Sequence, residues 1–212
     1  MAKIAFIITS TRKGRVGDKV GAYVKKIFDS VVSSENHITT VDVLDFNLPV
    51  FDEAVIPAMV PKHADWTTPH ARAWSDEIAK YDGYVILANE YNFGLSSSTK
   101  NAVDYLYHAW IGKPIMVVTY GIMGGTFSSD QLSNTLKMMH LKVVDTKPQL
   151  AFVGEPTGPD VMAAMRGELS DDTVKKWDAE KKGDLVKGLG ELETMLKEKA
   201  ADWQGVAEVK AE

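Results

Sequence analysis

Three loops, each following an apolar run, carry the residue types of this chain that suit ligand binding. The first, residues 9–17, reads Thr-Ser-Thr-Arg-Lys-Gly-Arg-Val-Gly and leads into a helical pattern near Asp18. Hydroxyls, glycines and two arginines at a helix N-terminus supply N–H groups, charge-assisted donors and a favourable dipole for a phosphate. The loop matches neither Gly-x-x-x-x-Gly-Lys-Ser/Thr nor Gly-x-Gly-x-x-Gly. We therefore expect an anion site without nucleoside triphosphate hydrolysis; a solvated basic turn is the alternative.

The second loop begins with Glu90-Tyr91-Asn92, directly after the apolar residues 83–88. Taken singly, Tyr91 also suits a half-buried aromatic at a sheet edge, and Asn92 suits an Asx turn. An aromatic and an amide together just past a buried strand favour contact with a ligand.

The third loop, residues 119–126, holds Gly121, Gly124 and Gly125. Glycines without side chains let a backbone approach a flat ligand closely and donate N–H groups to it. A plain glycine turn is the alternative, and the position at a strand end favours the ligand.

The elements that must position these loops alternate between short apolar runs and helical periodicity. Such alternation predicts an α/β fold with a parallel sheet, whose ligand crevice lies beyond the carboxyl ends of the strands. The predicted strands are residues 3–9, 39–44, 83–88, 114–119 and 143–152, and the predicted helices are residues 20–31, 72–80, 99–110 and 129–139.

Two regions depart from this alternation. Residues 49–69 contain four prolines and predict a long irregular excursion, which around Trp66 could wall the ligand site across a subunit interface. Residues 171–199 are rich in Lys and Glu, with leucines at helical spacing, and predict one amphipathic helix that covers the sheet in preference to a pure subunit contact. We expect a single domain over residues 1–199 and a frayed tail over 200–212.

Composition narrows the class of partner. The 212 residues include no cysteine, which excludes thiolate chemistry and suits a cytoplasmic, reducing compartment. A net charge of −5 argues against nucleic acid and anionic membranes as main partners, and the short apolar run at the N-terminus predicts no membrane span. The five histidines lack metal-ligand spacing, so we expect no metal site. A small molecule is the expected ligand.

Together the three loops resemble the NADPH-dependent FMN reductase family, which has a flavodoxin-like fold and includes quinone and azo-compound reductases. The likeness covers roughly residues 3–150. The family pattern is Gly-Ser-x-Arg after the first strand, Pro-Glu-Tyr-Asn with a following Lys-Asn-Ala-x-Asp, and Ser-x-Gly-x-x-Gly-Gly. This chain has Thr-Ser-Thr-Arg at residues 9–12, Asn-Glu-Tyr-Asn at 89–92, Lys-Asn-Ala-Val-Asp at 100–104 and Thr-Tyr-Gly-Ile-Met-Gly-Gly at 119–125. It implies a doubly wound five-stranded parallel sheet of order 2-1-3-4-5, with helices on both faces.

The resemblance also implies an FMN site. By this likeness, residues around the FMN phosphate are Ser10, Arg12, Arg15, Val16 and Gly17; residues along the isoalloxazine ring are Glu90, Tyr91 and Asn92; and residues at its pyrimidine side are Thr119, Gly121, Gly124 and Gly125. Three departures from the family pattern stand out: Thr9 replaces Gly, Asn89 replaces Pro, and residues 96–98 are serines where a proline-containing turn is usual.

The function implied is an FMN-dependent oxidoreductase. NADPH or NADH would reduce the flavin and leave, and quinones, azo compounds or free flavin would then be reduced at the same face. Catalysis needs no protein nucleophile because the cofactor carries the hydride. The family commonly forms dimers or dimers of dimers, so a homodimer or homotetramer is expected. A non-catalytic FMN-binding electron carrier or redox-sensing protein is the alternative, and Arg12 and Arg15 favour the reductase.

Overall fold

The computed structural model describes residues 1–60 and 65–202, with side chains as far as Glu198. Its sheet has the order β2-β1-β3-β5-β6, and β7 pairs with β5 beside β6. The parallel strands are β1 (Ala2–Ile8), β2 (Asn36–Asp42), β3 (Gly83–Tyr91), β5 (Pro114–Gly121), β6 (Lys142–Val143) and β7 (Gln149–Ala151). This order confirms the predicted doubly wound α/β fold.

The predicted strand over residues 143–152 is two short strands on one sheet edge. Between them, the backbone N–H and the hydroxyl of Thr146 donate to the Glu191 carboxylate, at 2.8 and 2.6 Å. Pro148 has no N–H to donate to the sheet. The chain therefore leaves the sheet edge after β6 and rejoins it at β7.

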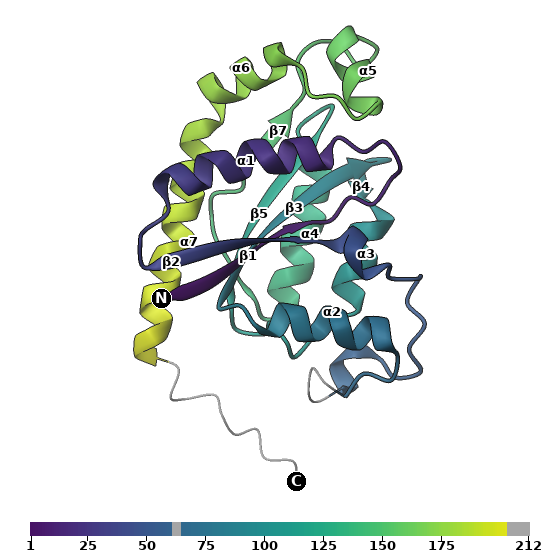
Figure 1. Cartoon of the computed structure of the whole chain (residues 1–212), viewed down its shortest axis with the longest axis vertical. Helices are drawn as coiled ribbons and strands as arrows, with labels where there is room; N and C mark the ends of the chain where they lie inside the picture. Colours follow the sequence, from purple (N-terminus) through teal and green to yellow (C-terminus); the bar gives the residue numbers. More distant parts are fainter. Residues whose placement is uncertain (61–64, 203–212) are drawn as a thin grey trace.

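Two hydrophobic cores lie on opposite faces of this sheet (Figure 1). One face is covered by α1 (Gly17–Val31), α6 (Asp171–Glu180) and α7 (Lys182–Asp202), and the other by α2 (Pro69–Ala79), α3 (Ser97–Asp104) and α4 (Thr126–Met138). Alternate side chains of β3 serve the two faces: Val85 and Leu87 belong to one core, and Tyr84 and Ile86 to the other. Because strands buried on both faces need apolar residues at every position, the central runs of the sequence are continuous.

Two predicted helices have different bounds in the structure. Helix α3 ends at Asp104, although Tyr105, Leu106 and Trp110 beyond it are buried. Periodic burial there reflects packing of an irregular segment and not a continuing helix. The predicted C-terminal helix is two helices, because the buried Trp177 on α6 donates from Nε1 to Ala151 O at 2.7 Å, which holds α6 at β7.

Helix α7 then lies along the sheet. Leu185, Leu189, Leu192 and Leu196 are all buried in its core, which confirms that these leucines cover the sheet. The helix runs to Asp202, past the expected start of the tail, and residues 203–212 lie outside the described residues. Within residues 1–60 and 65–202, no helix combines the length and apolar character needed to cross a membrane.

A short 3₁₀ helix, η1 (Val43–Phe46), precedes the proline-rich excursion, and a second, η2 (Pro57–Met59), lies within it. The Trp66 side chain is buried against Phe51 and Tyr105. That the excursion walls the ligand site across a subunit interface stays a prediction. Glu53 holds the end of the excursion to α2, because its carboxylate accepts hydrogen bonds from the N–H and hydroxyl groups of Thr67 and Thr68.

Replacing Glu53 with Gln should lower the melting temperature at pH 7 by roughly 2–4 °C, since one charge-assisted contact is lost. Burial raises the pKa of Glu53, but the hydrogen bonds from Thr67 and Thr68 outweigh it, so that the net pKa lies below the usual 4.5. A lowered carboxyl pKa stabilises the fold above pH 4.5 and stops doing so as pH falls through the folded-state value. Calorimetry of both proteins should therefore show the difference shrinking below pH 4.5. A difference that does not change with pH contradicts this role.

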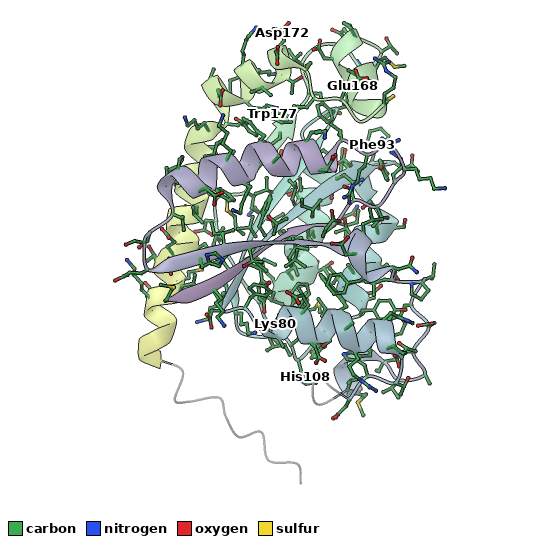
Figure 2. All side chains as sticks on the ribbon, viewed as in Figure 1. Lys80, Phe93, His108, Glu168, Asp172 and Trp177 are labelled. Carbon is green, nitrogen blue, oxygen red and sulfur yellow. The ribbon has the colours of Figure 1, made fainter. Side chains whose placement is uncertain are left out.

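The strand β3 is longer than predicted and turns back on itself. It includes Glu90 and Tyr91, which pair with Leu95 and Gly94 of the antiparallel strand β4 (Gly94–Leu95). These two residues therefore end the strand and do not follow it. Asn92 and Phe93 form the two-residue turn with φ of 49° and 60°, the positive values that a type I′ turn requires. Phe93 is 69% exposed and lies at the same end of the molecule as Glu168 (Figure 2).

Positive φ is costly for a side chain with a Cβ, and glycine avoids that cost. Phe93→Gly and Phe93→Ala both delete the ring, so comparing them isolates the backbone strain. We expect the Gly variant to be more stable than the Ala variant by about 1 kcal/mol, or roughly 2–4 °C in melting temperature. An Ala variant equal to or more stable than the Gly variant would mean that the turn is not strained.

Candidate functional site

A cavity of about 140 Å³ lies at the carboxyl ends of β3 and β5, between α1 and α5 (Pro159–Met165). Its lining comprises Arg12, Arg15, Val16, Asn89, Glu90, Tyr91, Tyr120, Gly121, Ile122, Phe152, Val161, Ala164 and Met165. Six of the twelve predicted site residues are among them. The other six, which do not line the cavity, are Ser10, Gly17, Asn92, Thr119, Gly124 and Gly125.

The first turn of α1 meets two hydroxyl groups beside this cavity. A Cβ added to Gly17 would lie 2.0 Å from Ser10 Oγ and 2.4 Å from Tyr120 Oη, so only glycine fits there. Ser10 Oγ is buried and has no hydrogen-bond partner among the described residues. Burial raises the pKa of Tyr120 to about 12, so its phenol stays protonated at neutral pH. No side chain caps α1 at Val16, so the backbone N–H groups of its first turn can donate hydrogen bonds to an anion.

The two arginines of the loop have different surroundings. Arg15 forms a bidentate ion pair with Asp42 at the end of β2, and it also donates to Ser10 O. The hydrogen bonds to Asp42 raise the pKa of Arg15. Its guanidinium is therefore already paired with groups of the protein, which argues against direct contact between Arg15 and a phosphate.

Arg12 is more exposed and spans the cavity mouth. Its guanidinium donates to Met165 O at 3.0 Å, to Lys13 O at 3.2 Å and, from Nε, to Tyr91 Oη at 3.3 Å. These neutral oxygens leave its positive charge without a carboxylate partner among the residues described. Arg12 is thus the loop cation available to an anionic ligand.

At the end of β3 and in the turn that follows it, some polar side chains hold the structure together and others reach the cavity. The Glu90 carboxylate accepts from Ser128 N at 3.0 Å, at the first turn of α4, where the helix dipole favours a negative charge. Tyr91 is half exposed at the cavity mouth. Asn92 does not line the cavity and lies in the type I′ turn at the tip of the hairpin.

In the glycine loop, most groups shape the loop itself. The buried Thr119 hydroxyl donates to Gly124 O at 2.9 Å. Gly124 and Gly125 both have φ of 80°, and a Cβ on Gly125 would lie 2.9 Å from Thr119 Cβ. At Gly121 an added Cβ would make only ordinary contacts, so this residue leaves space on the cavity side.

Two of the sequence departures meet in a buried chain of hydroxyls. Thr9 Oγ1 lies 2.6 Å from Thr99 Oγ1, which in turn lies 2.8 Å from Ser96 Oγ. Ser96 also caps α3 by accepting from Thr99 N at 3.3 Å. These contacts hold the start of α3 to the end of β1 without the proline that is usual at this position.

Helix α5 is the part of the site that the sequence reasoning missed. Val161, Ala164 and Met165 line the cavity from a segment more than 140 positions after Arg12, and the Arg12 guanidinium donates to Met165 O. Gly158-Pro159 could have signalled a helix start there, because proline favours the first helical position. Nothing in the sequence pattern places that helix over the loop at residues 9–17.

A second, larger cavity of about 550 Å³ lies between η1, the following excursion and the start of α3. It includes none of the twelve predicted residues and shares only Thr11 with the loop at residues 9–17. In the described part of the chain, no three His, Asp or Glu side chains gather into a group that could hold a metal ion. The smaller cavity is therefore the candidate site.

Known proteins with similar sequences or folds indicate the family of this chain. The NADPH-dependent FMN reductase family model matches residues 2–154. The NAD(P)H-dependent FMN reductase ntnL of Nectria sp is 44% identical over 201 residues, which is 93% of this chain and 98% of that protein. A quinone reductase of Escherichia coli (strain K12) is 26% identical over 158 residues, covering 72% and 77% of the two chains.

Among solved structures, the flavoenzyme NAD(P)H:(acceptor) oxidoreductase FerB of Paracoccus denitrificans aligns with a TM-score of 0.61 at 17% identity. The alignment covers 90% of this chain and 98% of that one, and at this identity it supports the fold alone. The family model and the close relative decide the matter: the chain belongs to the NADPH-dependent FMN reductase family.

Proposed function

We propose that this protein is an FMN-dependent NAD(P)H oxidoreductase that reduces quinones or similar small acceptors. The single observation that carries the proposal is the cavity, which unites the loops at the ends of β1, β3 and β5 in a chain of this family. The similarity to ntnL supports use of a nicotinamide donor, and the similarity to a quinone reductase supports the acceptor class.

The residues present fit FMN. Ser10 Oγ is buried with no hydrogen-bond partner among the described residues, Gly17 lets the first turn of α1 pass close to it, and Arg12 supplies a positive charge. This set suits a phosphate, for which helix N-termini and arginine are common partners. A volume of 140 Å³ holds part of the cofactor, since whole-ligand pockets are usually about 300–1,000 Å³. The flat ring would then lie at the cavity mouth, beside Tyr91 and Ile122.

When bound, FMN supplies the two-electron chemistry, accepting hydride from the nicotinamide and reducing the acceptor. The chain's own residues bind and orient it. Tyr120 keeps its proton and can act as a hydrogen-bond donor where its hydroxyl lies close to Gly17. The Arg15–Asp42 pair holds the loop in place, so Arg15 supports the phosphate site through the backbone of Ser10. No cysteine is needed, and the sequence contains none.

The proposal also covers the domain organisation, the location in the cell and the oligomeric state. Residues 1–199 form one domain, because both cores share a single sheet. The chain acts in the cytoplasm, for which its lack of cysteine is suited. It forms a homodimer or homotetramer, supported by the exposed apolar side chains of Val50, Ile56 and Met59 on the excursion. Light scattering of the purified chain tests the last of these, and a monomer would contradict it.

Turnover separates this function from a non-catalytic FMN carrier. The purified protein should show the visible absorption of oxidised flavin. Under anaerobic conditions NADPH or NADH should bleach it rapidly, and a quinone should restore it. A protein that binds FMN but is not bleached by either nucleotide would be a carrier and not the proposed enzyme.

Arg12→Ala should weaken FMN binding by roughly 1.5 to 3 kcal/mol, because one charge-assisted contact to the phosphate is lost. Flavin fluorescence quenching measures the dissociation constant. Lys26→Ala removes an equal charge from an exposed position farther along α1 and should leave affinity unchanged. Equal FMN affinity in Arg12→Ala and wild type would show that the loop does not bind the phosphate.

A further inference from the structure

Asn89 carries the most unusual polar group in the site. It lies in β3 opposite Tyr120 of β5 and is 3% exposed. Neither Oδ1 nor Nδ2 of its side chain has a hydrogen-bond partner among the described residues. Its backbone carbonyl, by contrast, accepts from Ser128 Oγ at 3.3 Å.

A buried amide with no partner is unfavourable, since it loses its hydrogen bonds to water and gains none in exchange. Most buried polar side chains in folded proteins are paired, so such a group needs an explanation. Asn89 lines the cavity, whereas its neighbour Ala88 belongs to the core on the other face of the sheet. The amide therefore faces the space that a ligand would enter.

The residues that share the cavity with Asn89 indicate which part of a ligand its amide would contact. The cavity lining combines Arg12 and Val16 of the proposed phosphate loop with Tyr91 and Gly121 of the proposed ring loops. Asn89 shares the cavity with both sets. In FMN the group that joins phosphate to ring is the ribityl chain, whose hydroxyls each donate and accept hydrogen bonds. A primary amide also offers a donor and an acceptor side by side.

We propose that the Asn89 amide positions FMN by donating to and accepting from hydroxyls of its ribityl chain. This inference rests on the proposed function, because it requires that FMN binds in this cavity. It also gives a physical reason for the departure from the family pattern, since proline has no side-chain polar group to offer.

The test compares three flavins on Asn89→Leu, which keeps a similar volume and removes both polar atoms. FMN and riboflavin share the ribityl chain, and lumiflavin lacks it. By fluorescence quenching, the dissociation constants of FMN and riboflavin should both rise roughly tenfold, while that of lumiflavin should change less than twofold. Similar losses for FMN and riboflavin assign the effect to the ribityl chain and not to the phosphate.

A second readout needs no flavin. In the flavin-free chain, Asn89→Leu should raise the melting temperature by roughly 2–4 °C, since it removes a buried amide without partners. Saturating FMN should then raise the melting temperature of Asn89→Leu by less than it raises that of the wild-type protein. Ser133→Ala is the matched control, because Ser133 Oγ is also buried without a partner but lies on α4 outside the cavity. It should leave all three flavin affinities unchanged.

Unchanged FMN affinity in Asn89→Leu would overturn the inference, as would an equal loss for lumiflavin. A flavin-free variant less stable than wild type would also overturn it, by showing that the amide has a structural role. These outcomes differ from failure of the proposed function, in which the wild-type protein itself would bind no FMN.

Discussion

The parallel pairing of β1, β3 and β5 is the constraint on which the rest of the structure depends. Ile8, the last residue of β1, pairs with Leu87, and Ala88 pairs with Thr119, so β3 and β5 run side by side a few residues past the end of β1. Loops that are about 80 and 30 residues apart in sequence must therefore leave the sheet side by side. Side-chain packing on both faces holds this register, because a shift by one residue would exchange the residues of the two cores.

At that edge, small residues and hydroxyls are packed so closely that the backbone itself forms much of the site. Gly17 can sit between Ser10 and Tyr120 only because it has no Cβ. Gly125 is constrained in the same way by Thr119, and its positive φ begins α4. The protein thus uses glycine here for close approach, and the space left at Gly121 is available to a ligand.

Polar residues of the site serve two different purposes. Arg15, Glu90 and Thr119 are engaged with Asp42, Ser128 and Gly124, and these contacts hold the three loops in shape. Ser10 and Asn89 are buried with unpaired side-chain atoms, and Arg12 meets only neutral oxygens among the described residues. In a site of this kind, the polar side chains that the fold leaves unpaired bind the ligand. The side chains that are paired with other residues hold the loops in position.

The sequence by itself determined the parallel α/β class, the central strands and the three loops, because continuous apolar runs and helical periodicity are local properties. It also pointed to six residues that line the cavity. Only the tertiary structure decided that Arg15 pairs with Asp42, that α5 covers the cavity and that Trp66 lies in the core. Each of these depends on contacts between distant segments, as between Arg12 and Met165. Periodicity shows which face of an element is buried, but it carries no information about which distant side chain or carbonyl will meet it there.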